Sequence, residues 1–175
     1  MANKVFDSLA ARVMRQLMEE LDLTDVQAAG IVGNFGHESG LISGRQQGTS
    51  ETAKPKPVMN KDGSQPKGGI DWPQWDGVRR RAFSEWLKRT KTPYPSYEAS
   101  MGFVLHELKS TPEKAALPAL RKQTTLKAAT ETFEKKYERA GVKAYPKRVE
   151  MAQRALRLYR EDKTKDKVAK AEEKS

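Results

Sequence analysis

The stretch GNFGHESGL, residues 33–41, contains a glutamate where an apolar helix is expected to end. Ala28, Ile31 and Phe35 repeat at the spacing of one helix face. Glu38 takes the next position on that face, where leucine would be the ordinary residue. Partial burial and the negative end of the helix dipole both favour the protonated form of a carboxyl group in this place. A neutral carboxylic acid can donate a proton to a leaving oxygen, which is what a general acid does in glycoside cleavage.

Three glycines, Gly33, Gly36 and Gly40, surround this glutamate in the sequence. They remove side-chain bulk beside the carboxyl group and would leave room for a bulky polymer. A structural interpretation also stays open, in which Gly40 ends the helix and Glu38 points to water. The glutamate alone therefore does not decide between catalysis and an ordinary helix end.

The elements that would position Glu38 are almost all helices, because apolar residues recur at helical spacing. Thr24 and Gln27 form the pattern of a capping box at the start of the helix that leads to Glu38. Asp76 and Ser96 are expected to cap two later helices, and Gly141 is expected to follow the end of another. The predicted helices cover residues 4–21, 25–37, 76–90, 94–110, 125–141 and 145–161, with a short helical turn within 111–122.

Two segments lack this periodicity. Residues 43–70 are rich in Gly, Pro, Ser and Lys, which predicts a long loop or a small hairpin between the second and third helices, bordering a substrate cleft. Residues 161–175 hold five lysines and five acidic residues, which predicts a charged, disordered tail. The expected organisation is therefore one mainly α domain over residues 1–160, beginning with an N-terminal helix within 1–22, followed by the tail.

Composition bounds the function of the chain. Its 175 residues are 37% hydrophobic and 32% charged, enough for one buried core. Cysteine is absent, which excludes disulfides, thiolate zinc sites and cysteine nucleophiles. We expect no signal peptide and no membrane-spanning segment, since the apolar residues are spaced rather than continuous. The net charge of +10 favours polyanionic partners, and it belongs to the folded body because the charges of the tail sum to zero.

A second motif follows the long loop. Glu-Ser-Gly at a helix end, then a loop, then GGIDWPQWDGVRRR opening a helix, resembles the phage tail (virion-associated) lysozyme family, within the wider lysozyme and lytic transglycosylase group. FEKKYERAG followed by YPKRVEMAQRAL is similar to the C-terminal helices of that family. The resemblance covers roughly residues 23–160.

This resemblance implies a lysozyme-like helical fold that cleaves the β-1,4 bond between N-acetylmuramic acid and N-acetylglucosamine. Glu38 would take the position of the catalytic acid. Indoles stack on sugar rings, a glutamine side chain can bond an acetamido group, and arginines bind the carboxylates of peptide stems. Core packing of the tryptophans and ion pairing of the arginine stay open as alternatives. The implied substrate-binding residues are Ser39, Trp72, Gln74, Trp75 and Arg79.

A glycoside hydrolase often needs a second carboxylate opposite the acid. Asp71, Asp76 and Glu51 are the candidates, and we favour Asp71 as the second catalytic residue. The family more often carries glycine at that position, which indicates either an added catalytic carboxylate or only a different turn. A glutamate acting alone is instead typical of lytic transglycosylases, which release 1,6-anhydro sugars. The sequence leaves hydrolase and transglycosylase both open.

No metal or other cofactor is expected. His37 and His106 each stand beside a glutamate, but adjacent residues on a helix face different ways and do not form a ligand set. The expected partner is bacterial peptidoglycan, with other phage tail or virion proteins as further partners, and without nucleic acid binding or membrane insertion. We expect a monomer that works from the phage virion, or from the host cytoplasm with delivery to the periplasm.

The leading hypothesis is therefore a phage-derived muramidase with Glu38 as its general acid. The first alternative is a lytic transglycosylase. The second is a peptidoglycan-binding module that has lost catalysis, which the positive charge would serve equally well. Glu38 separates these classes, because a binding module would tolerate glutamine at that position and an enzyme would not.

Overall fold

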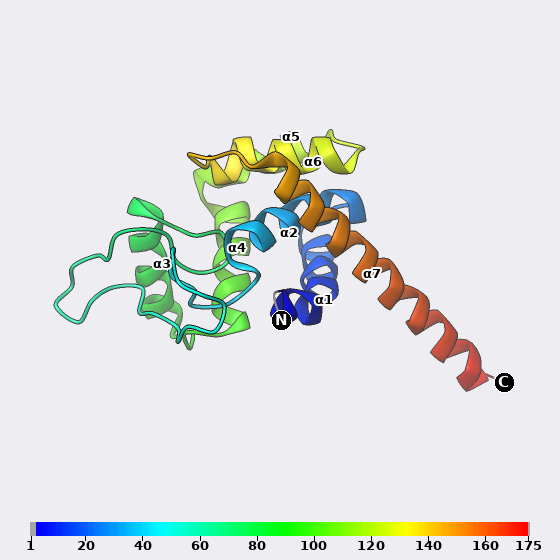
Figure 1. Cartoon of the computed structure of the whole chain (residues 1–175), viewed down its shortest axis with the longest axis horizontal. Coiled ribbons are helices and arrows are strands. Elements are labelled where there is room, and N and C mark those ends of the chain that lie inside the picture. Colours follow the sequence, from blue (N-terminus) through cyan, green and yellow to red (C-terminus); the bar gives the residue numbers. More distant parts are fainter. Residues whose placement is uncertain (1–2, 175) are drawn as a thin grey trace.

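The computed structural model describes residues 3–174 and is mainly helical, which confirms the predicted fold class. This part of the chain contains seven α-helices, a 3₁₀ turn (η1), a π-helical turn (η2) and no strand (Figure 1). The elements are α1 (Lys4–Leu21), α2 (Asp25–Ser39), α3 (Gly77–Thr90), α4 (Tyr97–Ser110), η1 (Pro112–Ala115), α5 (Ala116–Arg121), α6 (Leu126–Phe133), η2 (Glu134–Glu138) and α7 (Tyr145–Lys174).

Helix α2 lies at the centre of the molecule and packs against α1, α6 and α7 (Figure 1). Ten of its 15 residues are buried, so nearly every face of this helix belongs to the core. The predicted capping box is present: the Gln27 N–H donates to Thr24 Oγ1 at 3.3 Å, and the Thr24 N–H donates to Gln27 Oε1 at 3.1 Å. The helix that carries Glu38 is therefore fixed both along its length and at its start.

The glycines of α2 allow close helix packing, and the prediction that they make room for a polymer is wrong for Gly33 and Gly36. A methyl group added at Gly33 would lie 2.6 Å from the backbone nitrogen of Ala152 in α7. One added at Gly36 would lie 2.6 Å from the Phe6 ring of α1. Gly40 ends the helix, with φ of 66° and its N–H bonded to the Gly36 carbonyl. Both neighbouring helices can approach α2 because it carries no side chain at these contacts.

The segment between α2 and α3 is a long loop with two isolated β-bridges, which pair Ile70 with Gln46 and with Trp75. Arg80, at the start of α3, holds this loop through hydrogen bonds. Its fully buried guanidinium donates to the carbonyl oxygens of Val58 at 2.7 Å and Gly68 at 2.8 Å. The loop is thus tied to the helical body by a charged donor that satisfies buried backbone acceptors.

The helix predicted over residues 125–141 is divided in the structure, and Gly141 does not follow its end. Helix α6 stops at Phe133 and continues as the π-helical turn η2, which ends at Glu138. Arg139 takes the left-handed conformation, with φ of 50°, and its N–H bonds the Glu134 carbonyl at 2.6 Å. Buried side chains of η2 stabilise this wider turn, as described below. Their burial depends on the whole fold, so local helix propensity does not predict the turn.

Residues 161–174 continue α7 as a helix in the structure, where the sequence predicted a disordered tail. Figure 1 shows this end of α7 extending away from the body of the molecule. Its side chains are mostly exposed, and Arg15 of α1 forms ion pairs with Asp162 and Asp166 there. None of the helices described in residues 3–174 has the length and apolar character needed to cross a bilayer.

Removal of residues 163–175 is expected to lower the melting temperature by no more than about 2–4 °C, which corresponds to about 1 kcal/mol. Within 163–174 the deletion removes the exposed ion pair between Arg15 and Asp166 and little apolar contact. Differential scanning calorimetry of the two proteins measures the change. A fall well beyond this range would show that the end of α7 stabilises the body through contacts with α1.

Candidate active site

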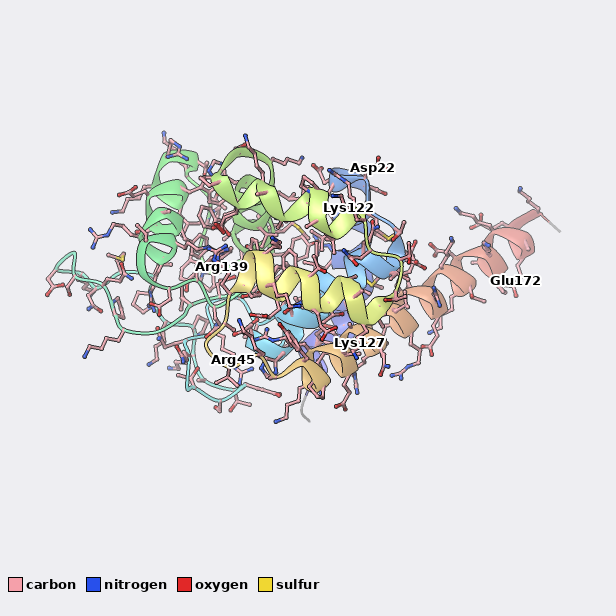
Figure 2. All side chains as sticks on the ribbon, turned by 90° about the horizontal axis from the view of Figure 1, so that it is seen from above. Asp22, Arg45, Lys122, Lys127, Arg139 and Glu172 are labelled. Atoms are coloured by element: carbon pink, nitrogen blue, oxygen red, sulfur yellow. The ribbon has the colours of Figure 1, made fainter. Side chains whose placement is uncertain are left out.

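A cleft of about 510 Å³ lies at the C-terminal end of α2. The loop after α2, the turn before α3 and the segment after η2 form its walls. Figure 2 labels Arg45 and Arg139, which belong to the first and the last of these segments. The lining residues are His37, Glu38, Arg45, Gln46, Gln47, Gly48, Thr49, Gly69, Pro73, Gln74, Asp76, Glu138, Arg139, Ala140, Gly141, Val142 and Arg148. Polar groups therefore dominate this cleft.

Glu38 lies in this cleft at the last turn of α2, with 18% of its side chain exposed. Its Oε1 accepts a hydrogen bond of 2.7 Å from Arg148 Nη2. Arg148 is 1% exposed and belongs to the first turn of α7. A charge-assisted bond between a buried guanidinium and a carboxylate is strong and directional. Glu38 is therefore held in place and is not a freely solvated helix-end glutamate.

Arg148 is itself fixed by three other acceptors. Its Nη1 donates to Asn34 Oδ1 at 3.1 Å, its Nε donates to the Lys143 carbonyl at 2.6 Å, and Nη2 also lies 3.4 Å from the Val142 carbonyl. The guanidinium thus joins α2 to the segment before α7. His37 also lines the cleft, and burial together with the nearby charge of Arg148 lowers its pKa, so the imidazole is neutral at neutral pH.

Glu138 is a second glutamate in this cleft, and the sequence analysis assigned it no role. Its Oε1 is fully buried and has no hydrogen-bond partner. Burial, and secondly the negative charge of Glu38, raise the pKa of Glu138 well above its ordinary value. Local sequence gave no signal for this role, because the helix end at Glu138 and the left-handed conformation of Arg139 are visible only in the structure.

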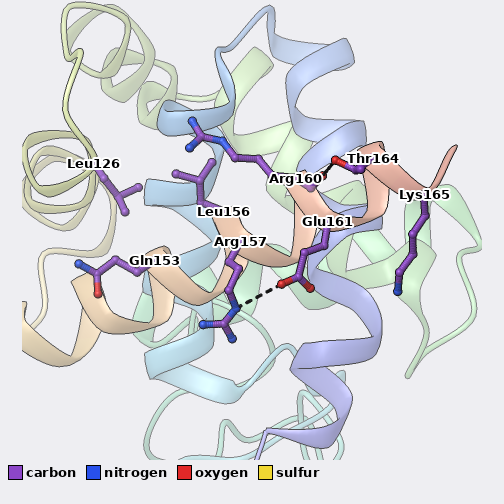
Figure 3. A pocket seen from close by; sticks show the side chains of 8 residues that line it. All are labelled: Leu126, Gln153, Leu156, Arg157, Arg160, Glu161, Thr164 and Lys165. Atoms are coloured by element: carbon purple, nitrogen blue, oxygen red, sulfur yellow. Dashed lines mark hydrogen bonds and ion pairs between the residues drawn. The ribbon is translucent and has the colours of Figure 1, made fainter. Parts of the chain in front are cut away.

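A larger hollow of about 660 Å³ lies between α6 and α7 and does not include Glu38 or Glu138. Figure 3 shows Leu126 of α6 apart from the other labelled residues, which all belong to α7, and the pairing of Arg157 with Glu161. That ion pair is exposed and spans 3.8 Å, so its energetic contribution is small. The polar side chains that line this hollow are all exposed ones on α7, and none of them is a buried titratable group, so we place the candidate site at the smaller cleft.

Comparison with known proteins gives the family. A family model for phage tail lysozymes matches residues 8–159. The chain belongs to the phage tail lysozyme family. The matched region runs from α1 into α7 and includes every residue that lines the cleft. No curated protein matches the chain. Membership supports a peptidoglycan-degrading, lysozyme-like function, with peptidoglycan as the substrate.

The tryptophans of the family motif lie in the core. Trp72 is fully buried and packs edge-on against Tyr97, with ring centroids 5.4 Å apart. Trp75 is 1% exposed, and its Nε1 donates to Glu107 Oε1 at 2.7 Å. Neither indole lines the cleft, so the expectation that they stack on sugar is not supported and the core-packing alternative describes them. Their large apolar rings stabilise the fold when they are buried.

Ser39 and Arg79 also have structural contacts in place of the expected substrate contacts. Ser39 is fully buried, and its hydroxyl donates to the carbonyl oxygens of Phe35 and Trp72. Arg79 donates to both carboxylate oxygens of Glu107 at 2.8 Å, the bidentate geometry that guanidinium groups favour. Neither residue lines the cleft. Ser39 therefore holds the motif turn to the end of α2, and Arg79 joins α3 to α4.

Gln74 is the expected substrate-binding residue that does line the cleft. It has φ of 60°, and its Nε2 donates to the carbonyl oxygens of Arg45 at 2.9 Å and Asp71 at 2.7 Å. Both amide protons therefore hold the wall of the cleft together. The amide oxygen remains the group with which Gln74 could accept a bond from a sugar.

Asp71 is fully buried and does not reach the cleft. Its carboxylate accepts hydrogen bonds from the backbone N–H groups of Gly44 at 2.7 Å and Trp72 at 2.9 Å, and it also bonds the Ser100 hydroxyl. These contacts join the loop after α2 to the motif turn and to α4. The structure therefore gives Asp71 a structural place, away from any substrate, whereas Asp76, which caps α3, lines the cleft.

Asp71→Asn is expected to change the pH dependence of stability. Burial raises the pKa of Asp71 from 3.8 to about 6, so the folded protein holds this proton more tightly than the unfolded chain. The resulting stability is present below a pH of about 4 and is lost as the pH rises to about 6, by up to about 3 kcal/mol. Urea unfolding near pH 4 and pH 7 measures the free energy of unfolding of both proteins. Between these pH values the variant should gain up to that amount of stability relative to the wild type. An equal difference at the two pH values would contradict the raised pKa.

Proposed function

We propose that the chain is a muramidase that hydrolyses the β-1,4 bond between N-acetylmuramic acid and N-acetylglucosamine, with Glu38 as its general acid. The observation that carries this proposal is the position of Glu38, held by a buried arginine at the edge of a polar cleft in a phage tail lysozyme fold. A glutamate that only ended a helix would have no need of such a partner.

In this mechanism the proton reaches the glycosidic oxygen from Glu38 as the bond to the anomeric carbon breaks. Arg148 occupies Oε1 of Glu38, which leaves Oε2 as the oxygen that delivers the proton. Glu38 then accepts a proton from the water that attacks the anomeric carbon. The fixed guanidinium stabilises the carboxylate formed after proton transfer and keeps it in one orientation.

The cleft also suits an anionic glycan with peptide stems. Arg45 and Arg139 line it, and the chain as a whole carries a net charge of +10. Guanidinium groups bind carboxylates bidentately, and the positive field attracts the polyanionic cell wall. We propose that the protein acts as a monomer and reaches peptidoglycan from the phage virion or, at lysis, from the host cytoplasm.

Product analysis tests the proposal. Purified Gram-negative peptidoglycan would be digested with the protein and the soluble muropeptides examined by mass spectrometry. Products with reducing N-acetylmuramic acid ends are expected. Products lighter by one water, with 1,6-anhydro ends, would show that the enzyme is a lytic transglycosylase. Binding to peptidoglycan without any soluble product would overturn the enzymatic function and leave a binding module.

A further inference from the structure

Glu138 is a partly buried titratable group in the cleft, with its Oε1 fully buried, and the mechanism above does not use it. We propose that Glu138 is the second carboxyl group of this site and stores the proton that Glu38 delivers to the glycosidic oxygen, an inference that rests on the proposed function. Glu138 acts through Glu38 by holding the proton in position, so it does not need to touch the substrate.

Glu138 is held rigidly in place by its neighbours. The residue before it, Tyr137, is fully buried, stacks on Phe133 with ring centroids 4.5 Å apart, and donates from its hydroxyl to Glu107 Oε1 at 2.6 Å. The Tyr137 carbonyl accepts a bond of 2.8 Å from Arg79 Nη1. Arg79, predicted from the sequence to bind substrate, therefore pairs with Glu107 and holds the turn that presents Glu138 to the cleft.

The start of the same turn is equally fixed. Glu134 is fully buried and accepts hydrogen bonds from the Tyr145 hydroxyl at 2.8 Å, the Ala140 N–H at 2.9 Å and Lys143 Nζ at 3.3 Å. These contacts bracket Glu138 on both sides. Its carboxyl group is thus held at the cleft by neighbours and not by bonds of its own Oε1.

The charges around Glu138 disfavour a further negative charge there. Two of the acids near it are already paired with arginines: Glu38 with Arg148, and Glu107 with Arg79. A further negative charge on Glu138 would lack such a partner in a buried place, which is costly. Burial and the charge of Glu38 raise the pKa of Glu138, so a proton neutralises it at neutral pH.

The ionisable groups that bear on Glu138 come from every surrounding element. They are Glu38 from α2, Arg79 from α3, Glu107 from α4 and Arg148 from α7, together with the cleft-lining residues His37, Arg45, Asp76 and Arg139. Arg148 is bonded to Glu38, whereas Oε1 of Glu138 has no hydrogen-bond partner.

The proposed step balances protons. The proton held by Glu138 passes to Glu38 across the cleft that both residues line, and Glu38 gives it to the glycosidic oxygen as the bond to the anomeric carbon breaks. Attack by water releases one proton, which returns the pair to its starting state. The pair carries one negative charge before the chemical step and two after the proton leaves, until water restores it. Arg148, bonded to Glu38 Oε1, offsets part of that charge.

The first test measures the proton itself and requires no substrate. The protein would be labelled with ¹³C at the glutamate side-chain carboxyl carbons, and their NMR shifts followed from about pH 4 to about pH 9. We expect the carbon assigned to Glu138 to remain in its protonated form near pH 7. A Glu138 signal that titrates near pH 4 or 5, together with the exposed glutamates, would overturn the proposal.

The second test is the pH profile of kcat/KM for Glu138→Gln, with Glu131→Gln on α6 as the matched control outside the cleft. Without the stored proton, Glu38 must take one from solvent, and this becomes harder as the pH rises. We expect a loss of at least about tenfold near pH 7 that largely disappears near pH 5, and no such change in the control. An equal loss at all pH values would show a structural role and overturn the proposal, as would full activity at pH 7.

These tests separate the inference from the proposed function. If the wild-type protein yields no product from peptidoglycan, the muramidase assignment fails, and NMR titration still decides whether Glu138 holds a proton. If product forms and Glu138 is ionised at neutral pH, the muramidase assignment holds, and the proposal that Glu138 stores a proton is wrong. The NMR measurement uses the wild-type chain, so it does not depend on the folding of a variant.

Discussion

Glu38→Gln is expected to lower kcat/KM on peptidoglycan by more than about 100-fold, because glutamine keeps the shape of the side chain and cannot donate the proton. The glutamine carbonyl can still accept the bond from Arg148, so the helix end should keep its geometry. The charge of Arg148 would then be buried without its counter-ion, which costs stability. We therefore expect a lower melting temperature with retained helical circular dichroism. Activity should be measured well below that temperature.

Glu85→Gln, on the exposed surface of α3, is the control for this substitution. It removes one negative charge from the same molecule without touching the cleft. Release of soluble muropeptides from dye-labelled peptidoglycan measures all three proteins under one set of conditions. A modest loss in Glu38→Gln, within about tenfold of the control, would rule out Glu38 as the general acid.

Gly33→Ala is expected to destabilise the fold by about 3 kcal/mol or more, with a fall in melting temperature of about 6–12 °C. The added methyl group would lie 2.6 Å from the backbone nitrogen and 2.7 Å from the Cα of Ala152. A backbone cannot rotate away from such a contact as a flexible side chain can. Helices α2 and α7 must therefore separate, at the contact beside which Arg148 joins Asn34 and Glu38.

Gly141→Ala is the matched control, because a methyl group added there meets no atom within 4 Å. Thermal unfolding of both variants measures the comparison, and the control should melt close to the wild type. If Gly33→Ala melted together with the control, the close packing of α2 on α7 would not be a constraint on the fold.

Local features of the sequence were sufficient to predict the helices and their starts. Thr24, Asp76 and Ser96 cap their helices through bonds to residues one to three positions away, so spacing alone identifies them. The helical end of the chain was not predictable in this way. Residues 161–174 make few tertiary contacts, and their helical form follows from continuation of α7 more than from an apolar face.

The site was only partly predictable, because burial is a property of the whole fold. The position of Glu38 on an apolar face gave a correct expectation of a partly buried carboxyl group at a helix end. Local sequence does not distinguish an indole that stacks on sugar from one that packs in a core. The positions of Trp72 and Trp75 could therefore be learned only from the structure. Glu138 depends on a π-helical turn that is set by the distant residues Glu107 and Arg79.

The length of α7 has a practical consequence for work with this protein. Arg148 lies in the first turn of α7 and Lys174 is its last described residue, so a rise of 1.5 Å per residue separates them by about 39 Å along the helix axis. A fluorophore or surface anchor attached near Lys174 would lie at the opposite end of α7 from the cleft. Immobilised or fused in this way, the enzyme should present its cleft to an insoluble wall without obstruction, and with the same orientation in every molecule.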